Sequence, residues 1–179
     1  MKKSLKNLLS TSIYFLLVLL FAFGMVTYIG QRIEVIGSSM WPTLEDGDNL
    51  FVEKFSYKFG KPKRFDIVVF PYKYEEKTNF IKRVIGLPGE TVFIDDEGRI
   101  YINGEVIEEG YGVEIIKDPG RAYEEITLAD DEYFVLGDNR NNSMDSRDPN
   151  VGNIKFEDIS GRVFMRVYPF KKLCMIKHQ

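Results

Sequence analysis

Histidine and cysteine are nearly absent from the sequence, and each shortage argues against a class of catalytic site. The one histidine, His178, is the penultimate residue. A chain terminus is usually mobile, so His178 is a poor general base or zinc ligand. The one cysteine, Cys174, has no disulfide partner within the chain, and we interpret it as a small apolar residue at the end of a strand. The sequence therefore argues against Ser–His–Asp and Cys–His catalysis, and it implies neither a metal nor an organic cofactor.

Basic residues are too few outside the N-terminus to form a nucleic-acid-binding face. Residues 1–30 contain three lysines and no acid, so the formal charge of −3 for the whole chain leaves −6 for residues 31–179. Nucleic-acid-binding domains have a basic patch or stripe on their surface. The acidic balance therefore argues against a nucleic-acid partner.

The first thirty residues contain a long uncharged segment. No charged residue lies between Lys6 and Arg32, and residues 13–29 are apolar almost throughout. At about 1.5 Å per residue, the roughly 20 residues that cross a bilayer core fit within this segment. The sequence therefore predicts a single transmembrane helix, with residues 1–30 as a cytoplasmic tip and anchor. The lysines before the span predict a cytoplasmic N-terminus and an extracytoplasmic domain over residues 31–179.

A cleavable secretory signal is the alternative for the same segment. Lys2 and Lys3 would form its basic start, and residues 22–24 include small residues at the spacing of a processing site. The apolar run continues past that point to Ile29, which is longer than the roughly 7–15 residues usual for a secretory signal. An uncleaved anchor is therefore the favoured prediction, and either alternative exports the same domain.

The rest of the chain has the pattern of an antiparallel β protein. Short β-branched and aromatic runs alternate with Gly, Pro, Asp and Asn, and Asn103-Gly104 is typical of a type I′ hairpin turn. No long stretch has helical periodicity. We therefore predict a mainly β catalytic domain, an antiparallel barrel or sandwich. The strands are expected at residues 33–36, 50–55, 66–70, 80–85, 91–94, 99–102, 105–107, 124–128, 133–136 and 162–167.

Without a usable histidine, a serine nucleophile needs another base, and a lysine serves only when it is neutral. Lowering a lysine pKa from about 10.4 to near 7 or 8 requires roughly 3–4 kcal/mol of bias against the charged form, which burial supplies. Lys82 is the candidate, because the two-residue period of a strand over residues 80–85 puts it on one face with Phe80 and Val84. The alternative is an edge-strand lysine whose amine reaches water.

Two further segments contain the polar groups that such a lysine would need. The sequence GSSMWPTL at residues 37–44 follows a strand and offers a hydroxyl and consecutive backbone N–H groups, as an oxyanion hole requires. The sequence GDNRNNSMDSR at residues 137–147 follows another strand and is dense in hydrogen-bonding side chains. It does not fit an EF-hand, because Arg140 occupies a ligand position. Taken singly, each segment also fits an ordinary turn or a surface Asx-rich loop.

Together with FIKRVIGLPGE at residues 80–90, these segments resemble the three conserved boxes of the type I signal peptidases, the serine–lysine proteases that remove secretory signals. Their order, their spacing and the N-terminal span all agree with that family, in its compact bacterial form. The resemblance implies that Ser39 is the nucleophile and Lys82 the general base. It also implies that Ser143 hydrogen-bonds and orients the lysine, and that Asp145 and Arg147 form a supporting ion pair.

The chain departs from the family pattern at two places. Some members have a serine two residues before the nucleophile that helps to bind the oxyanion, whereas this chain has Gly37. We therefore expect backbone N–H groups, that of Ser39 among them, to bind the oxyanion. The segment 148–152 is longer than the shortest family pattern, so no role is inferred beyond Arg147.

The resemblance also implies how substrates bind. A secretory preprotein would lie extended along residues 33–36 and 78–82, adding a β-strand. The resemblance further implies shallow pockets that select small residues at the first and third positions before the cut, in Ala-x-Ala type sites. Membrane lipid is the other expected partner, and Trp41 is either an interfacial residue or a packed loop residue. The expected substrate-binding residues are Ile33, Val35, Ile36, Phe80 and Ile81.

Two rival functions fit parts of the sequence. One is a self-cleaving serine–lysine protein similar to the SOS-response repressors, which the N-terminal span disfavours because those proteins are soluble and bind DNA. The other is a membrane-tethered, non-catalytic β domain that binds exported chains, which the presence of both Ser39 and Lys82 disfavours.

Overall fold

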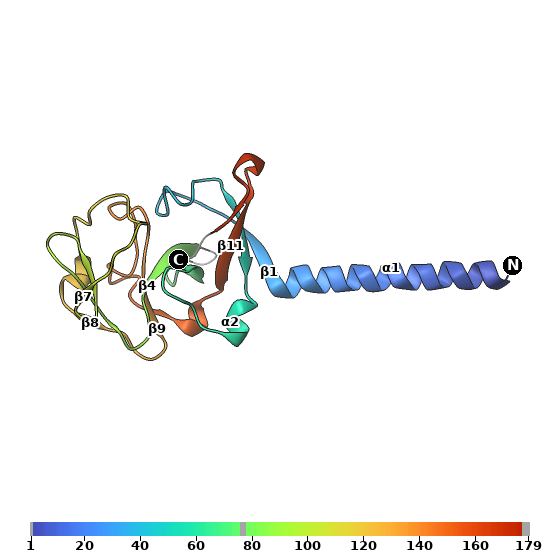
Figure 1. Ribbon diagram of the computed structural model, residues 1–179, viewed down its shortest axis with the longest axis horizontal. Coiled ribbons are helices and arrows are strands. Elements are labelled where there is room, and N and C mark those ends of the chain that lie inside the picture. The colour runs from blue at the N-terminus through green and yellow to red at the C-terminus, as the bar shows by residue number, and fades with distance from the viewer. Residues whose placement is uncertain (1, 76–77, 177–179) are drawn as a thin grey trace.

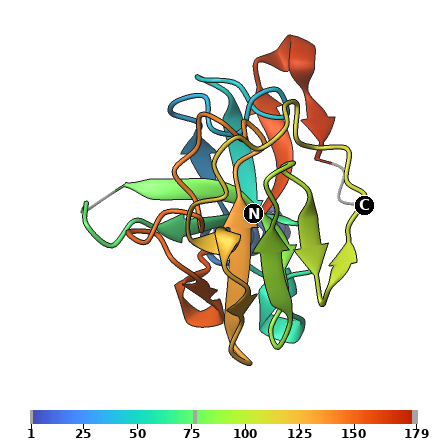
Figure 2. The same ribbon diagram turned by 90° about the vertical axis from the view of Figure 1, so that its left-hand side faces the viewer.

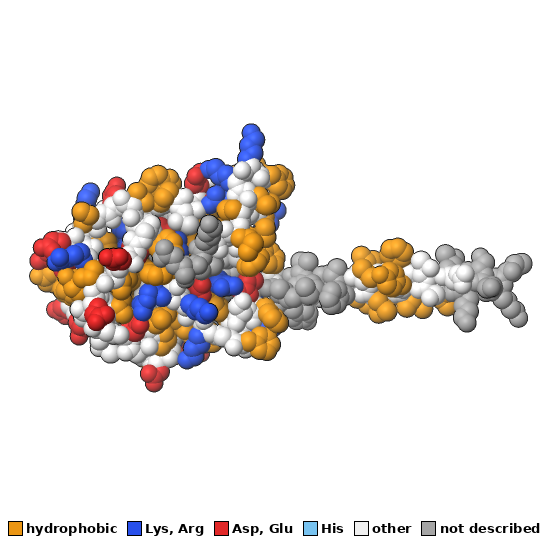
Figure 3. All heavy atoms as spheres, viewed as in Figure 1, with side chains coloured by type: hydrophobic (Ala, Val, Ile, Leu, Met, Phe, Trp, Pro, Cys, Tyr) orange, Lys and Arg blue, Asp and Glu red, His pale blue; other side chains and the backbone are white. Residues whose placement is uncertain are grey.

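A computed structural model describes residues 2–75 and 78–176 of the chain, without the side chains of residues 2–6, 8, 21–23 and 25–29. His178 lies outside the described residues. A long N-terminal helix, α1 (Lys2–Ile29), projects from a β-rich domain and runs directly into the first strand, β1 (Gly30–Glu34) (Figure 1). Hydrophobic side chains gather along part of the described length of α1, next to a stretch of uncharged polar ones, whereas the surface of the domain is mixed (Figure 3).

The predicted membrane anchor coincides with α1. Within the described part of the chain, no helix combines the length and the apolarity needed to span a bilayer. Several side chains of the predicted span, at residues 21–23 and 25–29, lie outside the description. The anchor therefore stays a prediction.

The domain consists of two antiparallel sheets, as the alternating pattern predicts. The larger sheet has eight strands. Seven of them follow one another in the order β1, β2 (Asn49–Glu53), β11 (Gly161–Tyr168), β3 (Ile67–Pro71), β4 (Asn79–Gly86), β9 (Glu132–Leu136) and β10 (Ile154–Lys155). The eighth, β12 (Cys174–Met175), pairs with β11. The smaller has four strands, in the order β7 (Glu105–Val106), β6 (Ile100–Ile102), β5 (Thr91–Ile94) and β8 (Ile126–Thr127).

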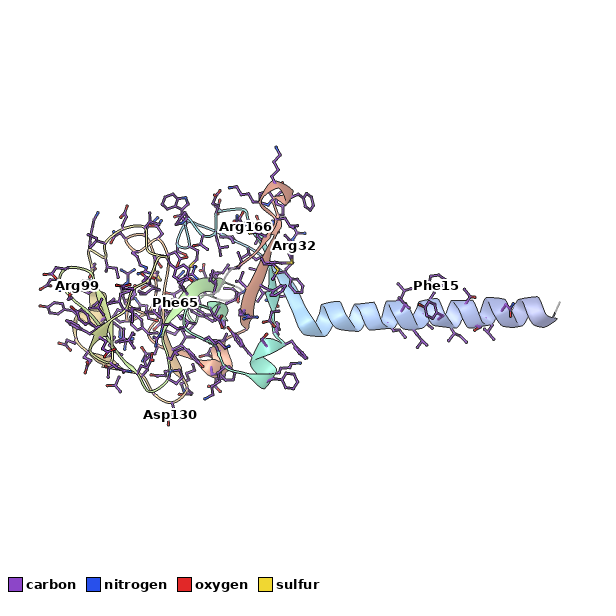
Figure 4. The ribbon with its side chains drawn as sticks, in the orientation of Figure 1. Phe15, Arg32, Phe65, Arg99, Asp130 and Arg166 are labelled. Carbon is purple, nitrogen blue, oxygen red and sulfur yellow. The ribbon has the colours of Figure 1, made fainter. Side chains whose placement is uncertain are left out.

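The two sheets lie at different distances from α1. The smaller sheet is at the end of the domain remote from α1, and Figure 2 shows it in front of the larger sheet (Figures 1 and 2). Arg32 marks the α1 end of the domain, Arg99 the remote end, and Phe65 lies between them (Figure 4). Short helical turns connect the strands, namely α2 (Ser56–Phe59), η1 (Gly120–Tyr123), η2 (Phe156–Asp158) and η3 (Phe170–Lys172).

Some strand boundaries differ from the prediction for identifiable reasons. The first strand begins at Gly30 rather than at Ile33, because it pairs with β2 directly where α1 ends. It stops at Glu34, after which the N–H of Val35 donates to the Asp48 carbonyl instead of extending the ladder. Only Ile126 and Thr127 of the predicted strand at 124–128 pair with a neighbour, because η1 and its exit occupy the preceding residues.

The buried side chains form three clusters, and two of them hold the loop after β1 and strand β4 in place. Met40 and Leu44 are buried in one cluster with Val69 of β3 and Ile81 of β4. Burying a side chain of this size contributes about 1.5–3 kcal/mol, so the loop after β1 is held firmly on the sheet. The opposite face of β4 contributes Val84 to a second cluster, against which Phe80 packs. The alternation predicted for β4 is therefore confirmed.

Candidate active site

Ser39 lies in the loop that follows β1, where Met40 and Leu44 anchor the chain. Gly37 has a φ of 87°, in the left-handed region that glycine adopts at little cost, and its N–H donates to a carboxylate oxygen of Asp46 at 2.7 Å. This backbone conformation suits the glycine at position 37. Among the described residues, none accepts a hydrogen bond from the N–H of Ser39. That N–H is therefore free to bind a ligand oxygen.

Lys82 is in the middle of β4, between β3 and β9, and only 3% of it is exposed. Its Nζ donates to Ser39 Oγ at 2.8 Å and to the Ile81 carbonyl at 3.1 Å, and it lies 4.9 Å from the centre of the Phe80 ring. Burial lowers the pKa of Lys82 to about 8, against the opposing influence of the Asp145 and Asp138 carboxylates. The amine is thus half neutral near pH 8, and its neutral form can accept a proton from the adjacent hydroxyl.

The unfavourable burial of this amine has a measurable consequence for stability. Lys82→Met is expected to raise the free energy of unfolding at pH 7 by about 1–3 kcal/mol, because a pKa difference of one unit corresponds to about 1.4 kcal/mol. The pKa falls from an ordinary value of 10.5 in the unfolded chain to about 8 in the folded protein. At pH 7 the amine is therefore protonated in both states, and the folded state contains a buried charge.

The pH dependence distinguishes this effect from a simple packing change. Between pH 8 and 10.5 the unfolded chain binds more protons than the folded protein, so the stability of the unmodified protein rises with pH in that window. Urea unfolding at pH 7 and pH 10 measures this rise, which Lys82→Met should lack. Lys155→Met removes an exposed lysine and is the control, with an expected change within about 0.5 kcal/mol. A Lys82→Met protein less stable than the unmodified one at pH 7 would contradict the expectation.

Asp145 and Arg147 form the ion pair predicted from the sequence. Arg147 Nε lies 2.8 Å from Asp145 Oδ1, and both side chains are buried. Asp145 Oδ2 also accepts the N–H of Gly137 at 3.0 Å. Gly137 in turn lies close to Ser39, because a Cβ added at Gly137 would be 2.5 Å from the Ser39 carbonyl oxygen. The ion pair therefore fixes a backbone segment that touches the loop of Ser39.

Ser143 differs from the prediction. Its Oγ is buried and has no hydrogen-bond partner among the described residues, so the expected bond to Lys82 is absent. The amine of Lys82 bonds to Ser39 and to the Ile81 carbonyl instead. The Ser143 side chain packs against Gly137, where an added Cβ would be 2.2 Å from Ser143 Oγ. A small residue at 137 is what makes room for this serine.

A buried cluster that the sequence analysis did not identify connects the three motif segments. Arg83 and Asp138 are fully buried, and Arg83 donates to Asp138 through Nε at 2.8 Å and Nη2 at 2.6 Å. Thr43 Oγ1 donates to Asp138 Oδ2 at 2.5 Å, and the Tyr111 ring covers the guanidinium at 3.5 Å. The available signal was a second cation, Arg83, directly after Lys82 in a strand that is otherwise apolar from Phe80 to Ile85, because a buried charge needs a charged or hydrogen-bonding partner.

A groove of about 600 Å³ leads to the Ser39–Lys82 pair, between β1 and the start of β4. All five predicted substrate-binding residues line it. Val35 and Ile81 are nearly buried in its floor, whereas Ile36 is 89% exposed. Its lining consists of Ile33, Glu34, Val35, Ile36, Ser39, Met40, Glu75, Thr78, Asn79, Phe80, Ile81, Lys82 and Met144. Within the described part of the chain, no group of three or more His, Cys, Asp and Glu residues is placed to hold a metal ion.

Known proteins share this sequence over most of its length. Residues 8–168 match the protein family described as signal peptidase, peptidase S26. A probable signal peptidase I-2 of Synechocystis sp. is 39% identical over 87% of this chain and 71% of that protein. A signal peptidase I of Leptolyngbya laminosa is 42% identical over 85% of this chain and 75% of that protein. The signal peptidase I P of Bacillus subtilis subsp. natto is 35% identical over 96% of this chain and 95% of that protein. This chain therefore belongs to the signal peptidase family, peptidase S26, and is an enzyme of that family.

Proposed function

We propose that this enzyme is a serine endopeptidase that removes N-terminal signal peptides from secreted preproteins, with Ser39 as nucleophile and Lys82 as general base. Its membership of the signal peptidase family supports the reaction. The observation that supports the two residues is the 2.8 Å separation of Lys82 Nζ from Ser39 Oγ, at a lysine that is buried. Burial favours the neutral amine, which is the form a base requires.

The proposed reaction has two halves. In the first, neutral Lys82 takes the hydroxyl proton, and Ser39 Oγ attacks the scissile carbonyl to give a tetrahedral oxyanion. The free N–H of Ser39 donates to this oxyanion. The Lys82 ammonium then gives its proton to the departing amine, the new N-terminus of the mature protein. The products of this half are an acyl-enzyme and a neutral lysine. In the second half Lys82 takes a proton from water, and the hydroxide attacks the acyl carbonyl. The bond to Ser39 Oγ then breaks, the Lys82 ammonium returns its proton to Ser39 Oγ, and the signal peptide is released.

Asp145 and Asp138 contribute through charge and through position. Both carboxylates raise the pKa of Lys82, opposite to the effect of burial. They therefore stabilise the ammonium that forms when the lysine takes the serine proton. Asp145 and Arg147 also fix Gly137 beside Ser39, which gives the pair a positioning role.

The substrate is proposed to bind as an extended chain between β1 and β4. Both segments run toward the Ser39–Lys82 pair in the direction of the sequence, so a precursor approaching its cleavage site lies parallel to both. Ile33, Ile36 and Phe80 border this path, and Val35 and Ile81 form its floor. Small side chains are proposed at the first and third positions before the cut, as the family resemblance implies.

The N-terminal helix is proposed to anchor the enzyme in the cell membrane. The support is the absence of charge between Lys6 and Arg32, together with the three lysines that precede the segment. In this arrangement residues 1–30 form the cytoplasmic tip and anchor, and residues 31–179 form the extracytoplasmic catalytic domain. A substrate tethered in the same bilayer then needs to find the enzyme in two dimensions only.

Incubation of the full chain in detergent with a secretory precursor tests the proposal. Mass spectrometry of the products should show one new N-terminus, directly after a small residue at the end of the signal sequence. A chain that binds the precursor and leaves it intact would instead be the non-catalytic binding domain.

The pH dependence of cleavage tests the role of Lys82. Because the amine must be neutral, kcat/KM should rise with pH, with an apparent pKa near 8 and a plateau above it. At pH 6 the rate should be about a hundredfold below the plateau, since each pH unit below the pKa reduces the neutral fraction about tenfold. The precursor should contain no group near the cut that titrates in this range. A flat profile from pH 6 to pH 10 would rule out Lys82 as the base.

A further inference from the structure

The active-site groove contains two carboxylates that the proposed reaction does not use. Glu34, at the end of β1, and Glu75, in the turn between β3 and β4, line it from opposite walls. Both residues are exposed, and neither carboxylate has an ion-pair or hydrogen-bond partner among the described residues. Most of the remaining lining is apolar, so these charges are the unusual feature of the groove.

Both carboxylates lie at the end of the groove away from the Ser39–Lys82 pair. Glu34 precedes Ser39 by five residues, and Glu75 lies before β4, in the hairpin that projects from the side of the domain (Figure 2). The strand rise of about 3.3 Å per residue separates Lys82 from Thr78 by about 13 Å. We consider a substrate that lies extended beside β4 with its scissile carbonyl at Ser39. Its fourth and fifth residues before the cut then lie beside Thr78, near this end of the groove.

Among the described residues that line the groove, no permanent cation offsets these two charges. The one other ionisable group in that described lining is Lys82, which is at the opposite end and loses its proton as the enzyme becomes active. A basic side chain of the substrate would be attracted to the acidic end of the groove, formed by Glu34 and Glu75, and an acidic one would be repelled. For exposed charges, each such contact changes a binding constant by a factor of about two to five.

We infer that Glu34 and Glu75 determine specificity, so that the enzyme prefers precursors with a lysine or arginine four or five residues before the cut. This inference rests on the proposed function, and it names a substrate class within it. Precursors with aspartate or glutamate at those positions are the disfavoured class.

A charge scan of one precursor tests the inference with the full chain in detergent. The parent precursor has glutamine at the second to sixth positions before the cut, apart from the small residue at the third. Single lysine and single glutamate replacements are compared with it by kcat/KM. A lysine at the fourth or fifth position should raise kcat/KM about fivefold and a glutamate should lower it about fivefold, with little change at the second position. Both effects should shrink in 0.5 M NaCl, where the screening length is about 4 Å.

Substitution of the two carboxylates then assigns the effect to this part of the groove. In a protein with both Glu34→Gln and Glu75→Gln, the ratio of the lysine substrate to the glutamine substrate should fall to about one. The ratio is measured within each protein, so a general change in activity cancels. Glu105→Gln removes an exposed carboxylate of the smaller sheet and should retain the ratio of the unmodified enzyme.

The outcomes separate this inference from the function on which it rests. Failure to cleave the parent precursor at all would overturn both. Cleavage with equal rates for lysine, glutamine and glutamate substrates would overturn the charge preference and leave the peptidase proposal standing. A preference for lysine that persists in the doubly substituted protein would overturn the assignment to Glu34 and Glu75.

Discussion

Ser39→Ala and Lys82→Met should each lower kcat/KM for precursor cleavage by about 10⁴-fold or more, which is the usual loss when a nucleophile or its base is removed. In the proposed reaction Ser39 supplies the atom that forms the acyl-enzyme, and Lys82, whose Nζ lies 2.8 Å from Ser39 Oγ, takes its proton. Because the two groups act as one unit, the double substitution should lower the rate little further than either change alone. Quantified cleavage of a purified precursor measures all three proteins.

Ser38→Ala is the matched control for the nucleophile. Ser38 is adjacent in sequence, but its Oγ accepts a hydrogen bond from Asn142 Nδ2 at 2.9 Å and has no contact with Lys82. Its removal should therefore have a small effect on the rate. If Ser38→Ala and Ser39→Ala lowered the rate equally, both would act by disturbing the loop conformation, and the assignment of Ser39 as nucleophile would be wrong. Unfolding in urea confirms that the inactive proteins remain folded.

The features that the sequence could predict depend on neighbours along the chain. The two-residue period of a strand is enough to put Lys82 and Phe80 on one face of β4, and they do share it. The ion pair of Asp145 and Arg147 was implied by the family resemblance, and its two residues lie within one segment of the chain. The Asn103-Gly104 turn signal likewise lies between the two strands that it connects, β6 and β7.

The features that the sequence could not predict depend on segments that are distant along the chain. Arg83 and Asp138 are separated by 55 positions, and only the pairing of β4 with β9 brings them together. The direction of the Ser143 side chain depends on the space left by Gly137. The short strands β10 and β12 have no strong pattern of their own, and they form because β9 and β11 offer an edge.

The same distinction applies to the pKa of Lys82. Its apolar neighbours in β4 are visible in the sequence, and they predict the direction in which the pKa moves. The opposing effects of Asp145 and Asp138 come from the segment after β9, and only the fold brings those carboxylates near the amine. The final value of about 8 is therefore a property of the assembled sheet, with burial and two carboxylates acting in opposite directions.

Removing one partner of the buried Arg83–Asp138 pair should have the largest effect on stability. Arg83→Met leaves the Asp138 carboxylate fully buried without its cation, and the expected loss is about 3–5 kcal/mol in the free energy of unfolding. Asp138→Asn leaves the arginine unpaired and should cost a similar amount. Urea unfolding measures both. Arg99→Met is the control, because it breaks an ion pair with Asp95 in which Arg99 is 53% exposed, and it should cost no more than about 1 kcal/mol.

The combined substitution Arg83→Met with Asp138→Leu separates the cost of an unpaired charge from the value of the pair. Since it removes both charges, it should recover much of the stability that either single change loses. It should not restore the hydrogen bond from Thr43, in the loop of Ser39, to Asp138, or the effect of this carboxylate on the pKa of Lys82. In any variant without this carboxylate that still cleaves precursor, the pH profile should move to lower pH. A double variant as unstable as the single ones, with an unshifted profile, would show that the cluster has neither role.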